Sequence, residues 1–230
     1  MESAVNLAPY TPVAPAITFN GSSYRSQVGE VIEDEYNEYV GDPDKIVALF
    51  QEGLDELGVE TPIEDITLTY LTSGSTTEVQ AEREYIQQSL EETLGLTVEL
   101  SVAGDNSLFI ADRNEGNYDF FLGGWDSDYN DPLDFLYTNY TDAYGMSFGG
   151  YSNTDYDALA DQLVGETDMD KRLDIYKQME QILLLDDCAF APIYYATKQV
   201  LLQNWVKDYR TSSFGASAEF IWTYIDGKNQ

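Results

Sequence analysis

Asp126, Asp128 and Asn130 place oxygen-bearing side chains at every second position of one short segment. This spacing begins like the calcium loop of an EF-hand, whose oxygen ligands occupy positions one, three and five. That loop also needs a glycine at position six and a bidentate glutamate at position twelve, where this chain has Asp131 and Tyr137. The sequence therefore argues against an EF-hand and leaves only an irregular calcium site open.

Carboxylate catalysis is a second chemistry that this segment suggests, because glycosidases use a pair of acidic side chains. With 42 acidic residues in the chain, however, such clusters arise by chance. Residues 145–149 (GMSFG) match the G-x-S-x-G segment around a nucleophilic serine. That chemistry needs a strand, a helix and a histidine, whereas the flanks read as loop and the chain has no histidine. We expect no enzyme, with a carboxylate-dependent hydrolase as a remote alternative.

Charge and apolar content restrict the partners further. The 230 residues carry 11 basic against 42 acidic side chains, a net charge of -31, which repels nucleic acid phosphates and anionic lipid. The acidity favours a role in solubility over attraction of cationic ligands. No apolar run reaches the roughly 18 residues of a membrane span, and no secretion signal opens the chain. The single cysteine, Cys188, follows an apolar helical run and is expected to be buried and inert.

The elements around the acidic segment give it a context. Residues 118–122 read as a fully buried strand that leads through Gly123 and Gly124 into Trp125. Ligands bind at the carboxyl ends of strands in open α/β sheets. Two glycines allow close backbone approach, Trp125 offers an apolar wall and Asp128 offers charge. The alternative is a loop in which Trp125 fills the core and the aspartates are solvated, and these residues alone do not separate the two.

Apolar spacing predicts the other elements. A helix begins at Asp42 and Pro43 and ends at Gly58, because aspartate caps helices and proline suits their first turn. Further helices are expected at residues 76–94, 108–113, 154–165 and 170–185. Strands are expected at 66–71, 97–102 and 118–122, and extended structure at 189–202. The alternation of strand and helix predicts a mainly parallel sheet covered by helices, an α/β fold.

Several motifs in a fixed order resemble the oligopeptide- and dipeptide-binding proteins that serve ABC transporters, the extracellular solute-binding proteins of family 5. The hallmark segment is residues 124–132 (GWDSDYNDP), and Arg113 upstream also fits. The other matches are residues 42–45 (DPDK), 150–157 (GYSNTDYD), 191–195 (APIYY) and 204–209 (NWVKDY). The resemblance covers residue 42 to the end, and ordered motifs are more specific together than any one alone.

The resemblance implies one carboxy-terminal lobe of a periplasmic-binding-protein-like type II fold, with a mixed or mainly parallel sheet flanked by helices. Family members are much longer and close two lobes over an extended peptide, so the chain resembles an excised lobe with an added Met1. We expect an irregular lead-in (1–41), a lobe core (42–199) and a segment that would return to the missing lobe (200–230). Four apolar residues of that last segment would then lack their partner: Trp205, Phe220, Ile221 and Trp222.

The function that the resemblance implies is capture of short peptides for uptake. The full-length protein would hand the ligand to the membrane permease subunits of an ABC transporter, from the cell surface or periplasm, and would be lipid-anchored. We expect no cofactor, no metal, no nucleic acid partner and no membrane insertion by this chain. The alternatives are relatives that bind nickel complexes, haem, oligosaccharides or signalling peptides, and the absence of histidine argues weakly against a metal ligand.

The resemblance also implies roles for single residues. The aspartate matching Asp128 takes the free amino terminus of the ligand, an ion pair that strengthens when closing lobes exclude water. Trp125 and Tyr129 would flank it, and backbone groups of Gly123 and Gly124 would bond the peptide main chain.

The remaining candidates are Asn130, Tyr195 and Arg113. Arg113 matches a position that holds the carboxyl end of the ligand in some members, and a surface arginine paired to nearby acids is the alternative. Leu122 and Ala196 stand where some members have an arginine and a tyrosine. These departures leave carboxylate recognition and the preferred peptide length open.

Overall fold

The computed structural model describes residues 11–28, 38–141, 150–197, 199–216 and 218–228. Its contacts divide the chain into two compact units. Unit 1 consists of Met1–Asp34 and Trp125–Gln230, and unit 2 is Glu35–Gly124. This division does not follow the boundaries 1–41, 42–199 and 200–230, and the assignment of the chain to one lobe stays a prediction.

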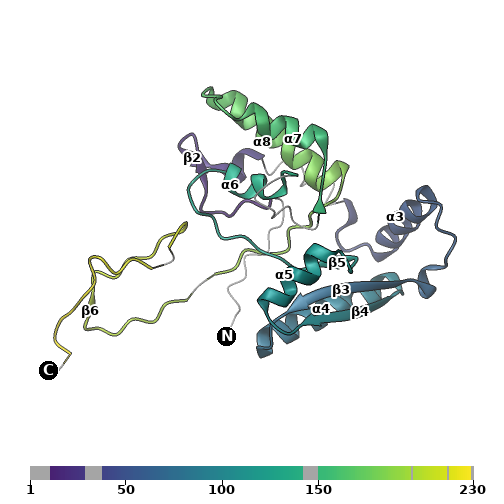
Figure 1. Cartoon of the computed structure of the whole chain (residues 1–230), viewed down its shortest axis with the longest axis horizontal. Helices are drawn as coiled ribbons and strands as arrows, with labels where there is room; N and C mark the ends of the chain where they lie inside the picture. The colour runs from purple at the N-terminus through teal and green to yellow at the C-terminus, as the bar shows by residue number, and fades with distance from the viewer. Residues whose placement is uncertain (1–10, 29–37, 142–149, 198, 217, 229–230) are drawn as a thin grey trace. The chain divides into compact units, whose positions relative to one another are not determined.

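Unit 2 contains a three-stranded parallel sheet with the strand order β4-β3-β5 (Figure 1). The strands are β3 (Thr67–Ser73), β4 (Thr97–Ala103) and β5 (Phe120–Phe121). The helices are α3 (Pro43–Glu56), α4 (Thr77–Leu94) and α5 (Asn106–Glu115), with a 3-10 turn at Ile63–Asp65. The chain passes from β3 to β4 through α4, and then from β4 across β3 to β5 through α5. Because both crossovers are right-handed, α4 and α5 lie on opposite faces of the sheet.

Adjacent residues of β3 show these two faces. Tyr70, 1% exposed, packs with apolar residues of α3 and α4, and its ring stacks on Phe120 at 4.7 Å between centroids. Leu71, also 1% exposed, packs on the other face with Phe109 of α5 and Phe121. Because side chains alternate along a strand, one strand supplies both cores.

The helix boundaries of unit 2 follow the predicted caps. The Asp42 side chain accepts a hydrogen bond from the Lys45 N–H, and Thr76 accepts one from Val79. Gly95 ends α4 in the left-handed conformation, with φ of 79°. Side-chain acceptors at the first turn and glycine after the last one are the ordinary ends of helices. The predicted start of α3 at Asp42 is confirmed.

The predicted strand at 118–122 is wrong in its length and burial. Only Phe120 and Phe121 pair, both half-buried, because β5 is an edge strand with one neighbour. Just before β5, the Asp119 N–H donates to the Thr69 carbonyl at 3.0 Å, and Oδ2 of Asp119 accepts the Thr69 N–H at 2.7 Å. The strand ends at Phe121, two residues before Gly123.

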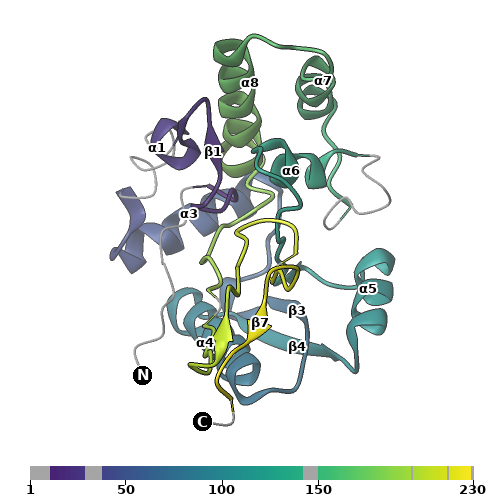
Figure 2. The ribbon, with the colours of Figure 1, turned by 90° about the vertical axis from the view of Figure 1, so that its left-hand side faces the viewer.

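Unit 1 is built from helices and short hairpins. Its elements are β1 (Thr18–Phe19), β2 (Ser22–Ser23), α1 (Tyr24–Val28), α6 (Leu133–Leu136), a 3-10 turn (Tyr137–Asn139), α7 (Thr154–Gln162), α8 (Met169–Gln181), a π-helical turn (Ile182–Asp186), β6 (Val206–Lys207) and β7 (Tyr224–Ile225). The helices α7 and α8 lie side by side (Figures 1 and 2). Asn20 and Gly21 both have positive φ, 48° and 77°, as a two-residue hairpin turn requires.

The segment predicted as an irregular lead-in supplies part of this core. Val13, Ile17 and Tyr24 are each 0% exposed and pack with residues of α6, α7 and α8. Residues 11–28 of the lead-in therefore contribute side chains to the core of unit 1.

One expectation in the second half of the chain needs correction. Residues 189–202, expected to be extended, have no helix and no paired strand in their described part, apart from an isolated bridge at Tyr195. Cys188 is exposed rather than buried. The chain leaves the apolar face after the π-helical turn, and Cys188 takes a left-handed φ of 47° with its thiol donating to the Leu185 carbonyl at 3.2 Å.

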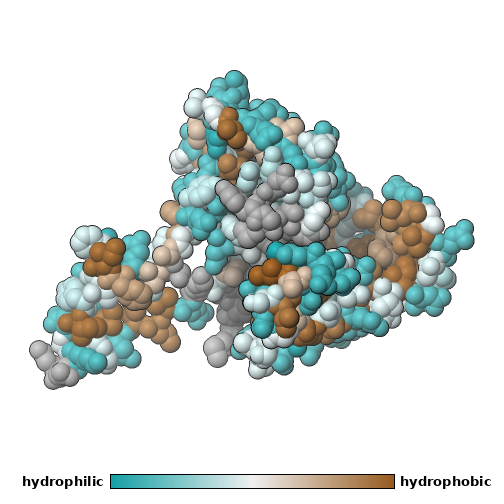
Figure 3. All heavy atoms as spheres, viewed as in Figure 1, coloured by the Kyte–Doolittle hydropathy of each residue, from teal (hydrophilic) through white to brown (hydrophobic). Residues whose placement is uncertain are grey.

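The β6–β7 hairpin presents apolar side chains at its surface, seen as brown patches at the left of Figure 3. Phe220, Ile221 and Trp222 are 67%, 84% and 58% exposed. That they pack on a further lobe stays a prediction. Within the described ranges, none of the helices combines the length and apolar character that crossing a membrane requires.

Candidate functional site

Residues 125–132, here called the acidic loop, run from the start of the second segment of unit 1 to helix α6. Four predicted site residues lie together on it: Trp125, Asp128, Tyr129 and Asn130. The loop has almost no regular structure of its own. Its shape therefore depends on the side chains that hold it.

Asp134, in the first turn of α6 and 8% exposed, is the first of these anchors. Its Oδ2 accepts the indole N–H of Trp125 at 3.1 Å and the backbone N–H of Asp128 at 2.8 Å. One nearly buried carboxylate thus fixes both the aromatic ring and the backbone of the candidate ligand carboxylate. Hydrogen bonds to an ionised acceptor are stronger than those between neutral groups.

A second anchor holds the other end of the loop to helix α8. Asp131 Oδ2 lies 3.2 Å from Arg172 Nη2, and Oδ1 accepts the Tyr176 hydroxyl at 2.6 Å. Tyr176 also contacts the Arg172 guanidinium. Burial, and then the hydrogen bond to Asp131, raise the pKa of Tyr176. The phenol therefore stays a donor, and this end of the loop is fixed to the core.

Asn130 makes the third anchor, to the β1–β2 hairpin. Its Oδ1 accepts the Thr18 N–H at 2.9 Å and its Nδ2 donates to the Thr18 hydroxyl at 2.8 Å. Both ends of the amide are thus engaged within unit 1. Asn130 holds the loop, and its predicted contact with ligand stays a prediction.

Asp128 and Tyr129 lie on the open side of the loop. Both are exposed, Tyr129 to 48%, and the Asp128 carboxylate has no hydrogen-bond or ion-pair partner among the described residues. Trp125 is half-buried and packs against the core of unit 1. The packed tryptophan and the exposed Asp126 and Asp128 match the second alternative that the sequence left open, and a role of Asp128 in ligand binding stays a prediction.

The other predicted site residues lie elsewhere. Gly123 and Gly124 are exposed at the end of unit 2, and a side chain added at Gly124 would meet nothing within 4 Å. Arg113 is half-buried in the last turn of α5 in unit 2.

Tyr195 has an internal partner in unit 1. Its hydroxyl donates to the Thr11 carbonyl at 2.6 Å, and burial raises its pKa to about 12. This bond holds the lead-in against the chain that follows α8, so the hydroxyl has a structural role.

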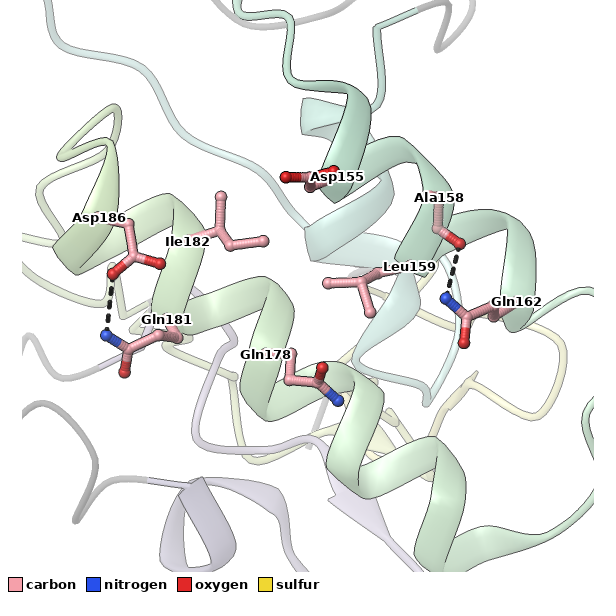
Figure 4. Close-up of a pocket in the computed structure, with 8 residues that line it drawn as sticks. All are labelled: Asp155, Ala158, Leu159, Gln162, Gln178, Gln181, Ile182 and Asp186. Carbon is pink, nitrogen blue, oxygen red and sulfur yellow. Dashed lines mark hydrogen bonds between the residues drawn. The ribbon is translucent and has the colours of Figure 1, made fainter.

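A depression of about 420 Å³ lies between α7 and the end of α8, away from the acidic loop (Figure 4). Its lining combines apolar residues such as Leu159 and Ile182 with five polar ones, Asp155, Gln162, Gln178, Gln181 and Asp186. The Gln162 carboxamide donates to the Ala158 carbonyl, and the Gln181 carboxamide donates to Asp186. Residues 145–149 lie outside the described residues.

The sequence analysis missed the residues that position the loop, namely Thr18, Asp134, Arg172 and Tyr176. A signal existed for three of them, Asp134, Arg172 and Tyr176. Asp131 and Asp134 flank the proline at the start of a helix, where side-chain acceptors are expected. Arg172 and Tyr176 are four residues apart on a helix and so share a face.

Comparison with known proteins adds to this geometry. Residues 7–147 match the family model of bacterial extracellular solute-binding proteins, family 5 Middle. Two relatives from Bacillus subtilis (strain 168) are the oligopeptide-binding protein OppA, 30% identical over 183 residues, and the dipeptide-binding protein DppE, 31% identical over 193 residues. These alignments cover 76% and 84% of this chain but 31% and 33% of the relatives. The chain thus spans about a third of the length of the curated relatives it matches.

A solved structure shows the same architecture. Listeria monocytogenes OppA bound to peptide superposes with a TM-score of 0.73 at 29% identity, over 96% of this chain and 40% of that chain. This likeness confirms the predicted α/β fold of the type II periplasmic-binding-protein class.

Proposed function

Because the chain belongs to the bacterial extracellular solute-binding proteins of family 5, we propose that it forms part of a receptor that captures short peptides for an ABC transporter. The oligopeptide- and dipeptide-binding relatives support a peptide ligand. Its action is binding and release of the ligand, without turnover. The permease subunits of the transporter are its partners through the full-length protein, which works at the cell surface or in the periplasm and is held there by a lipid anchor.

The observation that carries this proposal is the outward-facing carboxylate of Asp128 on a loop fixed at both ends. The backbone N–H of Asp128 is held by Asp134, and Asp131 is held by Arg172. A carboxylate whose backbone is already fixed loses little freedom when it binds a cation, so more of the attraction remains as affinity. The free amino terminus of a peptide is a cation of suitable size. We assign it to Asp128.

Substitution of Asp128 by asparagine tests this assignment. The variant removes the charge and keeps the size of the side chain, and the backbone bond to Asp134 does not depend on it. We expect the Kd for Ala-Ala-Ala to rise about tenfold, as loss of a charge-assisted contact implies, with thermal stability unchanged. Isothermal titration or NMR titration measures the Kd, and the thermal midpoint checks the fold.

Asp126→Asn is the matched control, because it removes the same charge from the same exposed loop. Its Kd is expected to change less than about twofold, since long-range attraction between exposed groups is screened by salt. An equal loss of affinity in both variants would indicate general attraction by the acidic surface, and would remove the specific role of Asp128.

A further inference from the structure

The tip of the β6–β7 hairpin contacts the acidic loop at Gly215. The backbone N–H of Gly215 donates to the carbonyl oxygen of Ser127 at 2.7 Å. Both residues belong to unit 1. This bond joins two segments that are 88 positions apart in the chain, at residues 127 and 215.

The backbone conformation at position 215 favours glycine. Its φ of 68° lies in the left-handed region, which residues with a Cβ adopt only at a cost. A Cβ built on Gly215 would lie 3.4 Å from the carbonyl oxygen of Asp128, an ordinary van der Waals contact. The backbone of the hairpin tip thus packs directly against the residue that carries the candidate ligand carboxylate.

The tip has a defined shape of its own. The Ser212 hydroxyl donates to the Phe214 carbonyl at 2.6 Å and closes the turn that presents Gly215. Behind it, the Glu219 N–H donates to the Arg210 carbonyl at 3.0 Å, and β6 pairs with β7. The contact with the acidic loop is therefore made by the end of an ordered hairpin.

Ser127 lies between the two groups that Asp134 holds, the Trp125 ring and the Asp128 N–H. It is 4% exposed, although its neighbours Asp126 and Asp128 are exposed. The Ser127 carbonyl and the Asp128 N–H belong to one peptide unit. Gly215 holds the carbonyl of this unit, and Asp134 holds its N–H. Together these bonds fix the plane of the Ser127–Asp128 peptide, from which the Asp128 side chain projects.

We propose that Gly215 is a positioning residue of the ligand site, and that the hairpin tip fixes the direction in which the Asp128 carboxylate points. The consequence for binding rests on the function proposed above, whereas the contact itself does not. The hairpin therefore transmits any change in its own position to the Asp128 carboxylate.

Gly215→Ala in the 230-residue chain tests the proposal. We expect the amide resonances of Ser127, Asp128 and Tyr129 to shift in the absence of ligand, because the peptide plane loses its restraint. We also expect the Kd for Ala-Ala-Ala to rise about fivefold, because a carboxylate that the hairpin tip no longer holds must be ordered when the ligand binds. Both are measured by NMR on isotope-labelled protein.

Gly227→Ala is the matched control. Gly227 also has a left-handed φ, 74°, in the same carboxy-terminal segment, but an added Cβ there meets nothing within 4 Å. It should leave the resonances of the acidic loop and the Kd unchanged. Gly215→Asn gives a second comparison, because asparagine tolerates this backbone conformation; it should shift the loop resonances less than alanine does.

The outcomes separate the two proposals. If Gly215→Ala leaves the loop resonances unchanged, or if Gly227→Ala shifts them equally, the positioning role of Gly215 is wrong. If the loop resonances shift as expected but the parent chain binds no peptide, the positioning contact stands and the peptide function fails.

Discussion

Glu180→Gln is expected to stabilise the chain by about 3 kcal/mol at pH 8 and to change its stability little at pH 5. Glu180 lies on α8 in the core of unit 1 and is 1% exposed. Burial raises its pKa from 4.5 to about 7. At about 1.4 kcal/mol for each factor of ten in a proton equilibrium, this difference corresponds to the expected gain.

The surroundings of Glu180 explain the raised pKa. Oε1 accepts hydrogen bonds from the Thr11 hydroxyl at 2.7 Å and from the Tyr24 hydroxyl at 2.8 Å. Oε2 is buried and has no partner among the described residues. The phenols of Tyr156 and Tyr195 also face it, and with pKa values raised by burial they stay neutral. A charge at this position is poorly solvated, and the neutral acid is favoured.

The sign of the pH dependence follows from the two states. In the unfolded chain Glu180 ionises above about pH 4.5, whereas in the folded chain it holds its proton to about pH 7. The folded state therefore binds more protons between these values, and the free energy of unfolding falls as the pH rises through this window. The contribution is constant above about pH 7. Glutamine resembles the neutral acid and does not ionise, so the variant lacks this destabilising contribution.

Urea unfolding of the parent and the variant between pH 5 and pH 8 measures this difference. Asp174→Asn is the control, because Asp174 is an exposed acid on the same helix and its loss changes the net charge equally. It should run parallel to the parent at every pH. If Glu180→Gln also runs parallel to the parent, the carboxyl is ionised in the folded state and our account of this site is wrong.

Asp134→Ala is the second large effect, with an expected loss of about 3 kcal/mol in the free energy of unfolding. The change leaves the Trp125 indole N–H and the Asp128 N–H without their common acceptor. Each orphaned donor costs about 1–3 kcal/mol when buried, and both are part-buried here. The emission of Trp125 should shift to the red as the ring loses its place against the core. Urea unfolding and fluorescence measure the two effects.

Two variants sharpen this test. Asp134→Asn keeps an acceptor oxygen and should lose only about 1 kcal/mol, because its bonds are no longer charge-assisted. Asp128→Asn changes a side chain on the same loop without touching the anchor, and should stay within about 0.5 kcal/mol of the parent. Equal stability of Asp134→Ala and the parent would show that the loop is held by other contacts.

The sequence predicted unit 2 well because its elements carry local signals. Asp42, Thr76 and Gly95 mark helix ends by their own chemistry, and apolar residues repeat with the period of each element. The lead-in carries no such signal. Its prolines and very short elements show no periodicity, and its bonds to Glu180 join residues 156 and 169 positions apart. Only the folded chain brings them together.

The sequence predicted where the candidate site lies. It did not predict which residues hold the loop and which face outward. The run of glycines, tryptophan and aspartates indicated the loop, and a strand does end just before it. Which oxygens face outward depends on distant partners, since Asn130 is engaged by Thr18 and Asp131 by Arg172. Asp128 and Asp131 are alike in sequence, yet within the described part of the chain only Asp131 forms an ion pair. No spacing rule separates them.

NMR titration of the chain with Ala-Ala-Ala and with its amino-acetylated form tests the central claim most directly. A chain that spans about a third of the length of its relatives is expected to bind peptide only in the millimolar range, about 4 kcal/mol, which NMR detects. We predict that the free-amine peptide shifts the resonances of Trp125 and Asp128 and that the acetylated peptide does not. Equal shifts from both forms would contradict the ion pair at Asp128, and no shifts from either would contradict peptide binding by this chain.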